Sequence, residues 1–282
     1  MARIATVFGA TGKQGSSVVR ALLADGTFKP RAVTRDVNSP AARKLAKQGC
    51  EVVQADMADK DSVKRAVDDA EVVFAVTIPF IAVSELDQGI NIIDASKEAG
   101  VRFLVFSTLP SLKALSNGKY PNIIPAEGNF LENVLASHVG LPPFSKTDNG
   151  YVMHLLGKPN MVLPWTWINR DLGPAVMALM KQYNTRSSEI VRQTFVLGVA
   201  RATAEEVAAE LAKGKTGQAR RGQMHGYLCG TDGERYGKYA FSTEFEWYPG
   251  VEIPDPRLTK LGVEVGSIEE FARTTLKAYV EA

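Results

Sequence analysis

The stretch Ile-Ala-Thr-Val-Phe-Gly-Ala-Thr-Gly-Lys-Gln-Gly, residues 4–15, decides the expected fold of this chain. An apolar run ends in three glycines spaced three apart, Gly9, Gly12 and Gly15, and an amphipathic run follows. A strand, a tight glycine turn and a helix start form the geometry that holds the pyrophosphate of a dinucleotide. In this geometry Gly9 permits the turn, Gly12 lets backbone approach the phosphates, and Gly15 lets the helix pack closely on the sheet. The stretch therefore predicts a dinucleotide-binding loop, spaced GxxGxxG rather than GxGxxG.

The segments after this loop alternate between strand and helix over the first hundred residues. Short apolar runs predict the strands, and periodic apolar residues predict the helices between them. The expected strands lie at 4–8, 31–35, 51–55, 71–77 and 101–106, and the expected helices after Gly15, near 39–48, at 60–69 and from Leu86 to Gly100, with Leu86, Ile90 and Ile93 on one face. Apolar strands joined by helices imply a doubly wound parallel sheet covered on both faces. Ligands of such α/β folds bind at the carboxyl ends of the strands.

In the second half of the chain the alternation of strand and helix patterns is less regular, and residues 110–170 carry many Pro, Gly and Asn residues. The expected elements are helices near 127–137, 169–183, 203–213 and 267–280, a strand at 194–199, and a loop or small irregular subdomain over 214–266. Thr203 and Glu206 have the spacing of a capping box. We expect one domain over residues 1–150. A smaller C-terminal α/β region, 151–282, is expected to complete part of that domain and to form a small subdomain for a substrate or partner.

Composition and charge exclude several classes of function. The chain has 282 residues, a net charge of +2, 45% hydrophobic residues and 23% charged residues, which gives no general attraction to nucleic acid or membranes. Cys50 and Cys229 have no paired spacing, so neither a disulfide framework nor a metal site is expected. With no signal peptide and no membrane-spanning run, we expect a cytoplasmic protein, with the nucleus as a second compartment.

The end of the second expected strand indicates which dinucleotide binds. An acidic residue about 20 positions after the glycines is typical of NAD-binding proteins. Here Arg35 stands 20 residues after Gly15, and a guanidinium suits a 2′-phosphate. Asp36 is expected to point elsewhere, so the pattern favours NADP over NAD; the alternative is that Arg35 is a solvated strand-end charge. Asp56 and Met57, after the third expected strand, are placed to flank an adenine, or they form an ordinary loop.

A set of motifs spans nearly the whole chain. They are Val-Phe-Gly-Ala-Thr-Gly-Lys-Gln-Gly at 7–15, Val-Thr-Arg at 33–35, Gln-Ala-Asp-Met at 54–57, Val-Thr-Ile-Pro at 76–79, Phe-Ser-Thr-Leu-Pro-Ser at 106–111, Asn-Phe-Leu-Glu-Asn at 129–133, Asp-Leu-Gly-Pro at 171–174 and Ala-Thr-Ala-Glu-Glu at 202–206. In this order they resemble the NmrA-like group of atypical short-chain dehydrogenases. The resemblance is specific to the family but not to one activity.

The resemblance implies an NADP-binding Rossmann domain and a smaller C-terminal region that forms a cleft beside it. Some members of the family are cofactor-sensing regulators that bind a transcription factor or another protein, and others are reductases. By motif position, the resemblance implies that the pyrophosphate is surrounded by Gly9, Thr11, Gly12, Lys13, Gln14 and Gly15. It also implies that the 2′-phosphate faces Arg35, the adenine faces Asp56 and Met57, and the nicotinamide ribose lies along Thr77, Ile78 and Pro79.

The chain departs from typical short-chain dehydrogenases at the catalytic residues. Those enzymes use a Tyr with a Lys four residues later, which lowers the pKa of the phenol for proton exchange with the substrate. No tyrosine here has such a lysine. The family also commonly keeps a lysine on a helix that precedes a further core strand, but residues 120–128 are too few to form both elements. One helix and one strand are therefore expected to be missing, through either a trimmed variant of the fold or an altered transcript.

Two functions of different classes follow from these expectations, and a scaffold that has lost cofactor binding is a third alternative. The first is a redox- or cofactor-sensing regulator without Tyr–Lys catalysis, which binds a regulatory protein or transcription factor. The second is an NADPH-dependent oxidoreductase acting on a small carbonyl, imine or enone, in which Ser107 polarises the carbonyl or Tyr120 donates a proton. The alternative for Ser107 is a hydroxyl that hydrogen-bonds a carbonyl at the strand end, and the alternative for Tyr120 is a packed aromatic ring. His138, His154 and the basic residues at 213–221 are expected at packing or surface positions, without direct binding of nucleic acid.

Overall fold

The computed structural model describes residues 2–79, 81–120, 129–136, 144–147, 150–153, 160–213 and 240–281. The chain divides into two compact units. Unit 1 comprises Met1–Thr108, Ile168–Thr194 and Lys260–Val263, and unit 2 comprises Leu109–Trp167, Phe195–Thr259 and Glu264–Ala282. Each unit is assembled from several lengths of chain. The expected division at residue 150 follows sequence order instead, and it stays a prediction.

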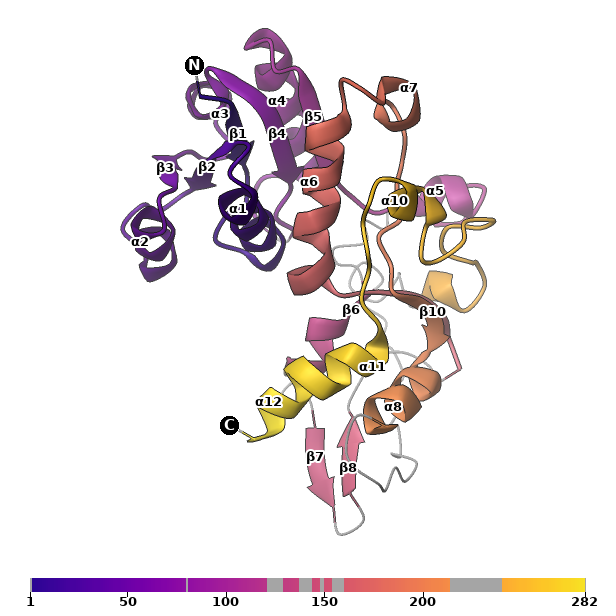
Figure 1. The fold of residues 1–282 in the computed structure, drawn as a ribbon. Helices are drawn as coiled ribbons and strands as arrows, with labels where there is room; N and C mark the ends of the chain where they lie inside the picture. Colours follow the sequence, from indigo (N-terminus) through magenta and orange to yellow (C-terminus); the bar gives the residue numbers. More distant parts are fainter. Residues whose placement is uncertain are drawn as a thin grey trace. The chain divides into compact units, whose positions relative to one another are not determined.

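Unit 1 is built on a parallel sheet of five strands in the order β3-β2-β1-β4-β5 (Figure 1). The strands are β1 (Ile4–Val7), β2 (Lys29–Thr34), β3 (Glu51–Gln54), β4 (Ala70–Val76) and β5 (Phe103–Ser107). Strands β1 and β4 are buried along most of their length because helices cover both faces, and they therefore read as apolar runs. The winding direction reverses between β1 and β4, so the expected doubly wound α/β fold is confirmed.

Helices cover both faces of this sheet. They are α1 (Lys13–Asp25), α2 (Pro40–Lys47), α3 (Lys60–Val67), α4 (Glu85–Glu98) and α6 (Gly173–Gln182). The short helix α7 (Ser187–Ile190) follows α6 and contacts it. Helix α1 packs against α6, and α3 packs against α4. Phe103 of β5 stacks on Tyr183 at the end of α6, with 5.0 Å between the ring centroids. The next residue, Leu104, packs into the core cluster that contains Ile92 of α4, so the two helix pairs lie on opposite faces.

Helix α4 presents an apolar stripe to the outside. Leu86, Ile90 and Ile93 share one face, as their spacing predicts, but their side chains are 68%, 46% and 49% exposed. The opposite face of α4 meets the sheet instead, through small residues such as Gly89 and Ala95 and through Ile92. Helical periodicity alone identified the stripe correctly and could not tell which face is buried.

Residues 168–194 return to unit 1, and their first part docks on α1. The Ser17 hydroxyl donates to the carbonyl of Ile168 at 2.9 Å and accepts from the N–H of Gly173 at 3.2 Å. A Cβ at Gly173 would lie 2.5 Å from the Ser17 carbonyl oxygen, so only glycine permits this approach. Helix α6 is therefore fixed against α1 by a buried hydroxyl and a missing side chain.

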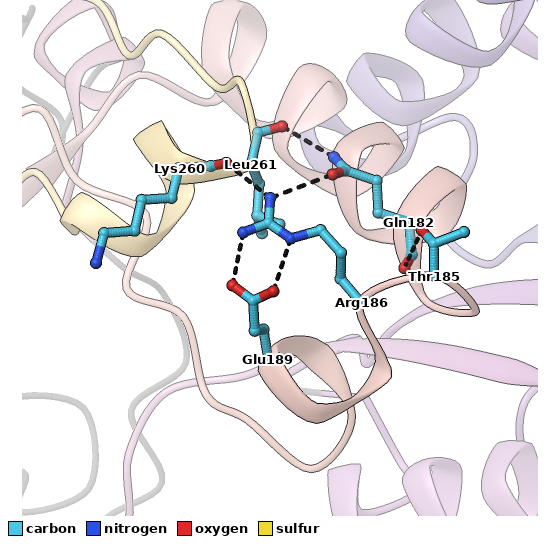
Figure 2. Close-up of polar contacts among 6 residues, drawn as sticks. All are labelled: Gln182, Thr185, Arg186, Glu189, Lys260 and Leu261. Carbon is cyan, nitrogen blue, oxygen red and sulfur yellow. Dashed lines mark hydrogen bonds and ion pairs between the residues drawn. The ribbon is translucent and has the colours of Figure 1, made fainter.

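A polar cluster fixes Lys260–Val263 to the same unit (Figure 2). Nη1 of Arg186 donates to the carbonyl of Lys260 at 2.7 Å, while Nε and Nη2 bind the carboxylate of Glu189 at 2.8 and 2.6 Å. The amide of Gln182 donates to the carbonyl of Leu261 at 2.9 Å. Two side chains from the α6–α7 region thus bind the backbone of a segment far along the chain.

Unit 2 holds a small second sheet and a short hairpin. The strands of the sheet, in the order β10-β9-β6, are β10 (Ala200–Thr203), β9 (Val162–Thr166) and β6 (Asn129–Phe130), and the hairpin pairs β7 (Phe144–Thr147) with β8 (Gly150–Met153). The helices are α5 (Leu112–Leu115), α8 (Ala204–Lys213), α10 (Pro256–Lys260, whose last residue lies in unit 1), α11 (Ile268–Phe271) and α12 (Lys277–Glu281). Its core is rich in aromatic residues, including Trp165, Trp167, Phe241, Trp247 and Phe271.

Two expectations for this half of the chain are wrong. Residues 194–199 form no strand, because Val196 donates its N–H to the Asp255 carboxylate at 3.2 Å and ladder pairing with β9 begins only at Ala200. The helix expected near 127–137 is a 3₁₀ helix over Leu131–Leu135 in the described part. The capping box before α8 is confirmed, since Thr203 Oγ1 accepts from the N–H of Glu206 at 3.1 Å.

None of the helices in the described ranges is long and apolar enough to cross a bilayer. The same ranges hold no group of His, Cys, Asp and Glu side chains arranged to bind a metal ion.

Candidate functional site

The glycine loop between β1 and α1 is shaped by the absence of side chains. Gly9 has φ of +62°, a conformation that favours glycine. A Cβ at Gly15 would lie 2.3 Å from the Gly9 carbonyl oxygen, so the start of α1 packs directly on the turn. At Gly12 the backbone is extended, and a Cβ would meet the Gly9 oxygen at 3.3 Å. The three glycines thus have separate roles: turn, exposed backbone and close packing.

The first turn of α1 lacks an internal cap. Gly12 is the residue before the helix and has no side chain, so no side-chain hydrogen bond caps the helix. The first N–H groups of a helix have no acceptor within it, and together with the helix dipole they attract an anion. No acidic residue occupies this first turn. The loop therefore has the shape and the polarity of a phosphate-binding cradle.

Gln14 connects this cradle to β5. The hydroxyl of Ser107, the last residue of β5, donates to Oε1 of Gln14 at 2.6 Å. Both side chains are partly buried. A pyrophosphate-loop candidate and a weak catalytic candidate, which lie far apart in sequence, are therefore direct neighbours.

The carboxyl end of β2 presents one free cation. Arg35 is exposed and has no hydrogen bond or ion pair with any residue that the structure describes. Asp36 turns into its own loop, where Oδ1 accepts from the N–H of Asn38 at 2.8 Å. Arg31, further back in β2, binds Glu51 at 2.9 Å and is a structural residue. Among the cations that the structure describes at this strand end, the Arg35 guanidinium is therefore available for a ligand.

The carboxyl end of β3 carries one polar side chain, Asp56, and one buried apolar side chain, Met57. Oδ1 of Asp56 accepts from the N–H of Ala58 at 2.9 Å, so this carboxylate orders its own turn. The Met57 side chain is 6% exposed and packs in the core with Phe8 and Val63. Its carbonyl accepts from Nδ2 of Asn91 at 2.9 Å.

The carboxyl end of β4 is held by α4. The hydroxyl of Thr77 donates to the Glu85 carboxylate. The buried amide of Gln88 accepts from the N–H of Ile78 at 2.9 Å and donates to the Ile78 carbonyl at 2.9 Å. Pro79 follows and is partly buried. Gln88 and Asn91 were not predicted as site residues, because the sequence does not show which face of α4 is buried.

Tyr120 lies in unit 2, where its ring packs edge-on against Phe241 and Phe245 with centroids 5.8 and 6.1 Å apart. Its hydroxyl donates to the Glu244 carboxylate at 2.9 Å. Burial, together with this acceptor, raises the pKa of Tyr120 above its ordinary value. Proton exchange in short-chain dehydrogenases needs the pKa lowered. The geometry is that of a packed aromatic ring.

Several weaker candidates lie outside the described residues. These are His138, His154 and the basic positions 215, 220 and 221.

Residues 1–125 match the model of the NmrA-like family. Three NmrA-like family domain-containing oxidoreductases are similar to the chain. That from Aspergillus hancockii is 40% identical over 42% of this chain and 37% of its own length. Those from Malbranchea aurantiaca and Aspergillus flavus are 33% and 30% identical over 62% and 63% of this chain. The matches span only 62% and 64% of those two relatives.

Solved structures of both regulators and reductases share the fold. NmrA, a negative transcriptional regulator in complex with NADP, has a TM-score of 0.74 at 18% identity, covering 100% of this chain and 98% of its own. The triphenylmethane reductase of Citrobacter sp., complexed with NADP(H), has a TM-score of 0.68 at 16% identity, covering 97% and 99%. The family match over residues 1–125 agrees with the strand order of the parallel sheet and with the fold that these solved structures share.

Proposed function

We propose that this chain binds NADP(H) across the carboxyl ends of β1, β2, β3 and β4. The observation that carries the proposal is the cradle at the start of α1, where Gly9 has a positive φ and Gly15 has no room for a Cβ. An empty structural loop needs neither the uncapped helix start nor this glycine spacing. Solved proteins of the same fold, NmrA among them, are complexes with NADP or NADP(H).

The proposed contacts follow the strand ends. The pyrophosphate would be held by Gly9, Thr11, Gly12, Lys13, Gln14 and Gly15, the 2′-phosphate by Arg35, the adenine by Asp56 and Met57, and the nicotinamide ribose by Thr77, Ile78 and Pro79. The free guanidinium of Arg35 supports NADP over NAD, since a 2′-phosphate offers it a bidentate anionic acceptor. The cofactor, when bound, supplies hydride-transfer chemistry, and the protein supplies position and electrostatics.

We further propose that the protein acts as a cofactor-sensing regulator. Both weak catalytic candidates already use their hydroxyl in an internal hydrogen bond, Ser107 to Gln14 and Tyr120 to Glu244, so neither is set to polarise or protonate a substrate. A sensor needs only a different affinity for NADPH and NADP⁺ in two conformations, one of which binds a regulatory protein. NmrA, which shares the fold, is a negative transcriptional regulator.

A second candidate function is an NADPH-dependent oxidoreductase acting on a small carbonyl, imine or enone. The names of the curated relatives favour it, since they are oxidoreductases. Ser107 supports it by position, because it ends β5 next to the glycine loop and could turn its hydroxyl toward a carbonyl. In this function the proton donor would be a water molecule or a substrate group, because no Tyr–Lys pair exists.

Calorimetric titration of the purified protein with NADPH, NADP⁺ and NADH tests the proposal. We expect binding of the two 2′-phosphorylated forms and at least tenfold weaker binding of NADH. Unequal affinities for NADPH and NADP⁺, with no NADPH oxidation against a panel of quinones, enones and imines, would support the sensor. Turnover with any of these would support the reductase, and no binding of the three nucleotides would overturn both.

A further inference from the structure

Gln88 is a fully buried amide that acts on the loop after β4. It is 0% exposed and lies in the first turns of α4. Its oxygen accepts from the N–H of Ile78 at 2.9 Å, and its nitrogen donates to the carbonyls of Ile78 at 2.9 Å and Val83 at 3.0 Å. A buried amide is normally fully hydrogen-bonded, and here all three bonds go to one loop.

The chemistry of this contact requires an amide. Ile78 lies two residues past the end of β4, where the strand ladder has stopped. The Gln88 side chain gives the N–H of Ile78 an acceptor and the carbonyl of Ile78 a donor, as a neighbouring strand would. A carboxylate could accept but not donate, and an apolar side chain could do neither. The Gln88 side chain thus replaces a missing strand partner.

Asn91, three residues later, acts on the loop after β3. Its Nδ2 donates to the carbonyl of Met57 at 2.9 Å. Residues three apart lie on neighbouring parts of one helix face, so one helix holds both loops. The apolar stripe of Leu86, Ile90 and Ile93 lies away from these contacts and is exposed. Helix α4 therefore connects the two strand ends to which the two halves of the cofactor are assigned.

We propose that Gln88 and Asn91 are positioning residues that set the two halves of the cofactor site separately. Gln88 fixes the loop for the nicotinamide ribose, and Asn91 fixes the loop for the adenine. This inference rests on the proposed NADP(H) binding and adds two residues that touch no cofactor themselves. Each acts through a backbone that it holds in place.

The test compares whole and half ligands. We expect Gln88→Met to weaken binding of NADPH about tenfold, as expected for loss of hydrogen bonds that hold a buried loop. Binding of 2′,5′-ADP, which carries only the adenosine half, should stay within about twofold of wild type. Asn91→Ala should weaken the binding of NADPH and the binding of 2′,5′-ADP by the same factor. The crossed pattern distinguishes two positioning residues from general destabilisation.

Gln182→Met is the matched control. It also removes an amide that donates to a backbone carbonyl, that of Leu261, at a distance of 2.9 Å. It should lower the melting temperature without changing the affinity for either ligand. Hydrogen exchange adds a readout independent of any ligand: the Ile78 amide should exchange faster in Gln88→Met than in wild type. Gln88→Glu keeps an acceptor for that amide and loses both donors, so it serves if the Met variant fails to fold.

The possible results distinguish a failure of the proposed NADP(H) binding from a failure of the positioning roles of Gln88 and Asn91. If wild type binds neither ligand, the proposed function fails and the inference fails with it. If wild type binds both but Gln88→Met and Gln88→Glu leave NADPH affinity unchanged, or weaken both ligands equally, the inference is overturned and the proposed function stands.

Discussion

The hydroxyl of Ser107 donates a hydrogen bond of 2.6 Å to Oε1 of Gln14, and so joins the end of β5 to the first turn of α1. The bond orients the Gln14 side chain at the edge of the glycine loop. It also uses the hydroxyl that a reductase would need to polarise a substrate. The relationship therefore favours a role for Ser107 in ordering the loop.

Ser107→Ala releases Gln14, and we expect the affinity for NADPH to fall about fivefold, since a hydrogen bond of this kind contributes ~1 kcal/mol. Ser107→Thr keeps a hydroxyl and should bind NADPH nearly as tightly as wild type. Calorimetry measures both. Unchanged affinity in the Ala variant would show that the loop does not depend on this bond.

Gly12→Ala and Gly15→Ala should fail in different ways. A methyl group at Gly15 would lie 2.3 Å from the Gly9 carbonyl oxygen, so we expect a loss of ~1–3 kcal/mol of stability. A methyl group at Gly12 meets that oxygen at 3.3 Å, so the fold should survive while NADPH affinity falls at least tenfold. Thermal melting and calorimetry separate the two effects. Equal melting temperatures for the two variants would contradict the separate roles of these glycines.

Arg35→Asp should change the cofactor preference. An acidic side chain at this strand end repels a 2′-phosphate and can accept from a ribose 2′-hydroxyl, so the preference for NADPH should shift toward NADH. Arg65→Asp makes the same charge change on an exposed face of α3 and should leave the preference unaltered. The ratio of the two dissociation constants is the measurement. If Arg35→Asp keeps the wild-type ratio, Arg35 is only a solvated charge.

Glu71 should make the stability of unit 1 depend on pH. The Arg3 guanidinium donates to both carboxylate oxygens, at 2.9 and 2.8 Å, and holds the pKa of Glu71 below its ordinary value of 4.5. A lowered pKa gives stability that is complete above pH 4.5 and is lost as the pH falls through the folded-state pKa. Arg3 is partly exposed, so solvent screening limits the effect to about 1 kcal/mol.

Melting curves of wild type and Glu71→Gln check this effect. The variant should melt a few degrees lower at neutral pH, and the difference should shrink as the pH falls below 4.5. Glu252→Gln, at an exposed carboxylate without a partner in the described structure, should show no such difference. A difference in melting temperature between wild type and Glu71→Gln that does not depend on pH would contradict the proposed effect of this ion pair.

Local patterns predicted unit 1 well. The glycine spacing from Gly9 to Gly15 and the alternation of apolar runs depend on neighbours in sequence, so strands β1 to β5 lie within one or two residues of their expected positions. The N-cap at Thr203 is local in the same sense and is confirmed. Such features need no knowledge of distant contacts.

Features that depend on distant partners could not be predicted. Strand β9 contains Pro164, and a proline argues against a strand. In the structure, β6 pairs with Trp165 and Thr166 of β9. Pro164 therefore lies where β9 has no partner on its β6 side among the described residues, and the missing N–H of the proline is tolerated. The run at 194–199 is apolar but is bound by Asp255 and other distant groups. The burial of Gln88 beneath a loop likewise depends on where that loop returns.

The polar cluster around Arg186 has a consequence for synthesis of the chain on the ribosome. The first 108 residues contain the whole parallel sheet, yet α6 covers α1 only after residues 168–194 have emerged. The last segment of unit 1, Lys260–Val263, then binds Arg186 and Gln182. Domains fold as units during translation, so the nascent sheet stays incompletely covered until most of the polypeptide has been made. Ribosome-stalled chains from which residues 168–194 have not yet emerged should therefore recruit chaperones that longer ones release.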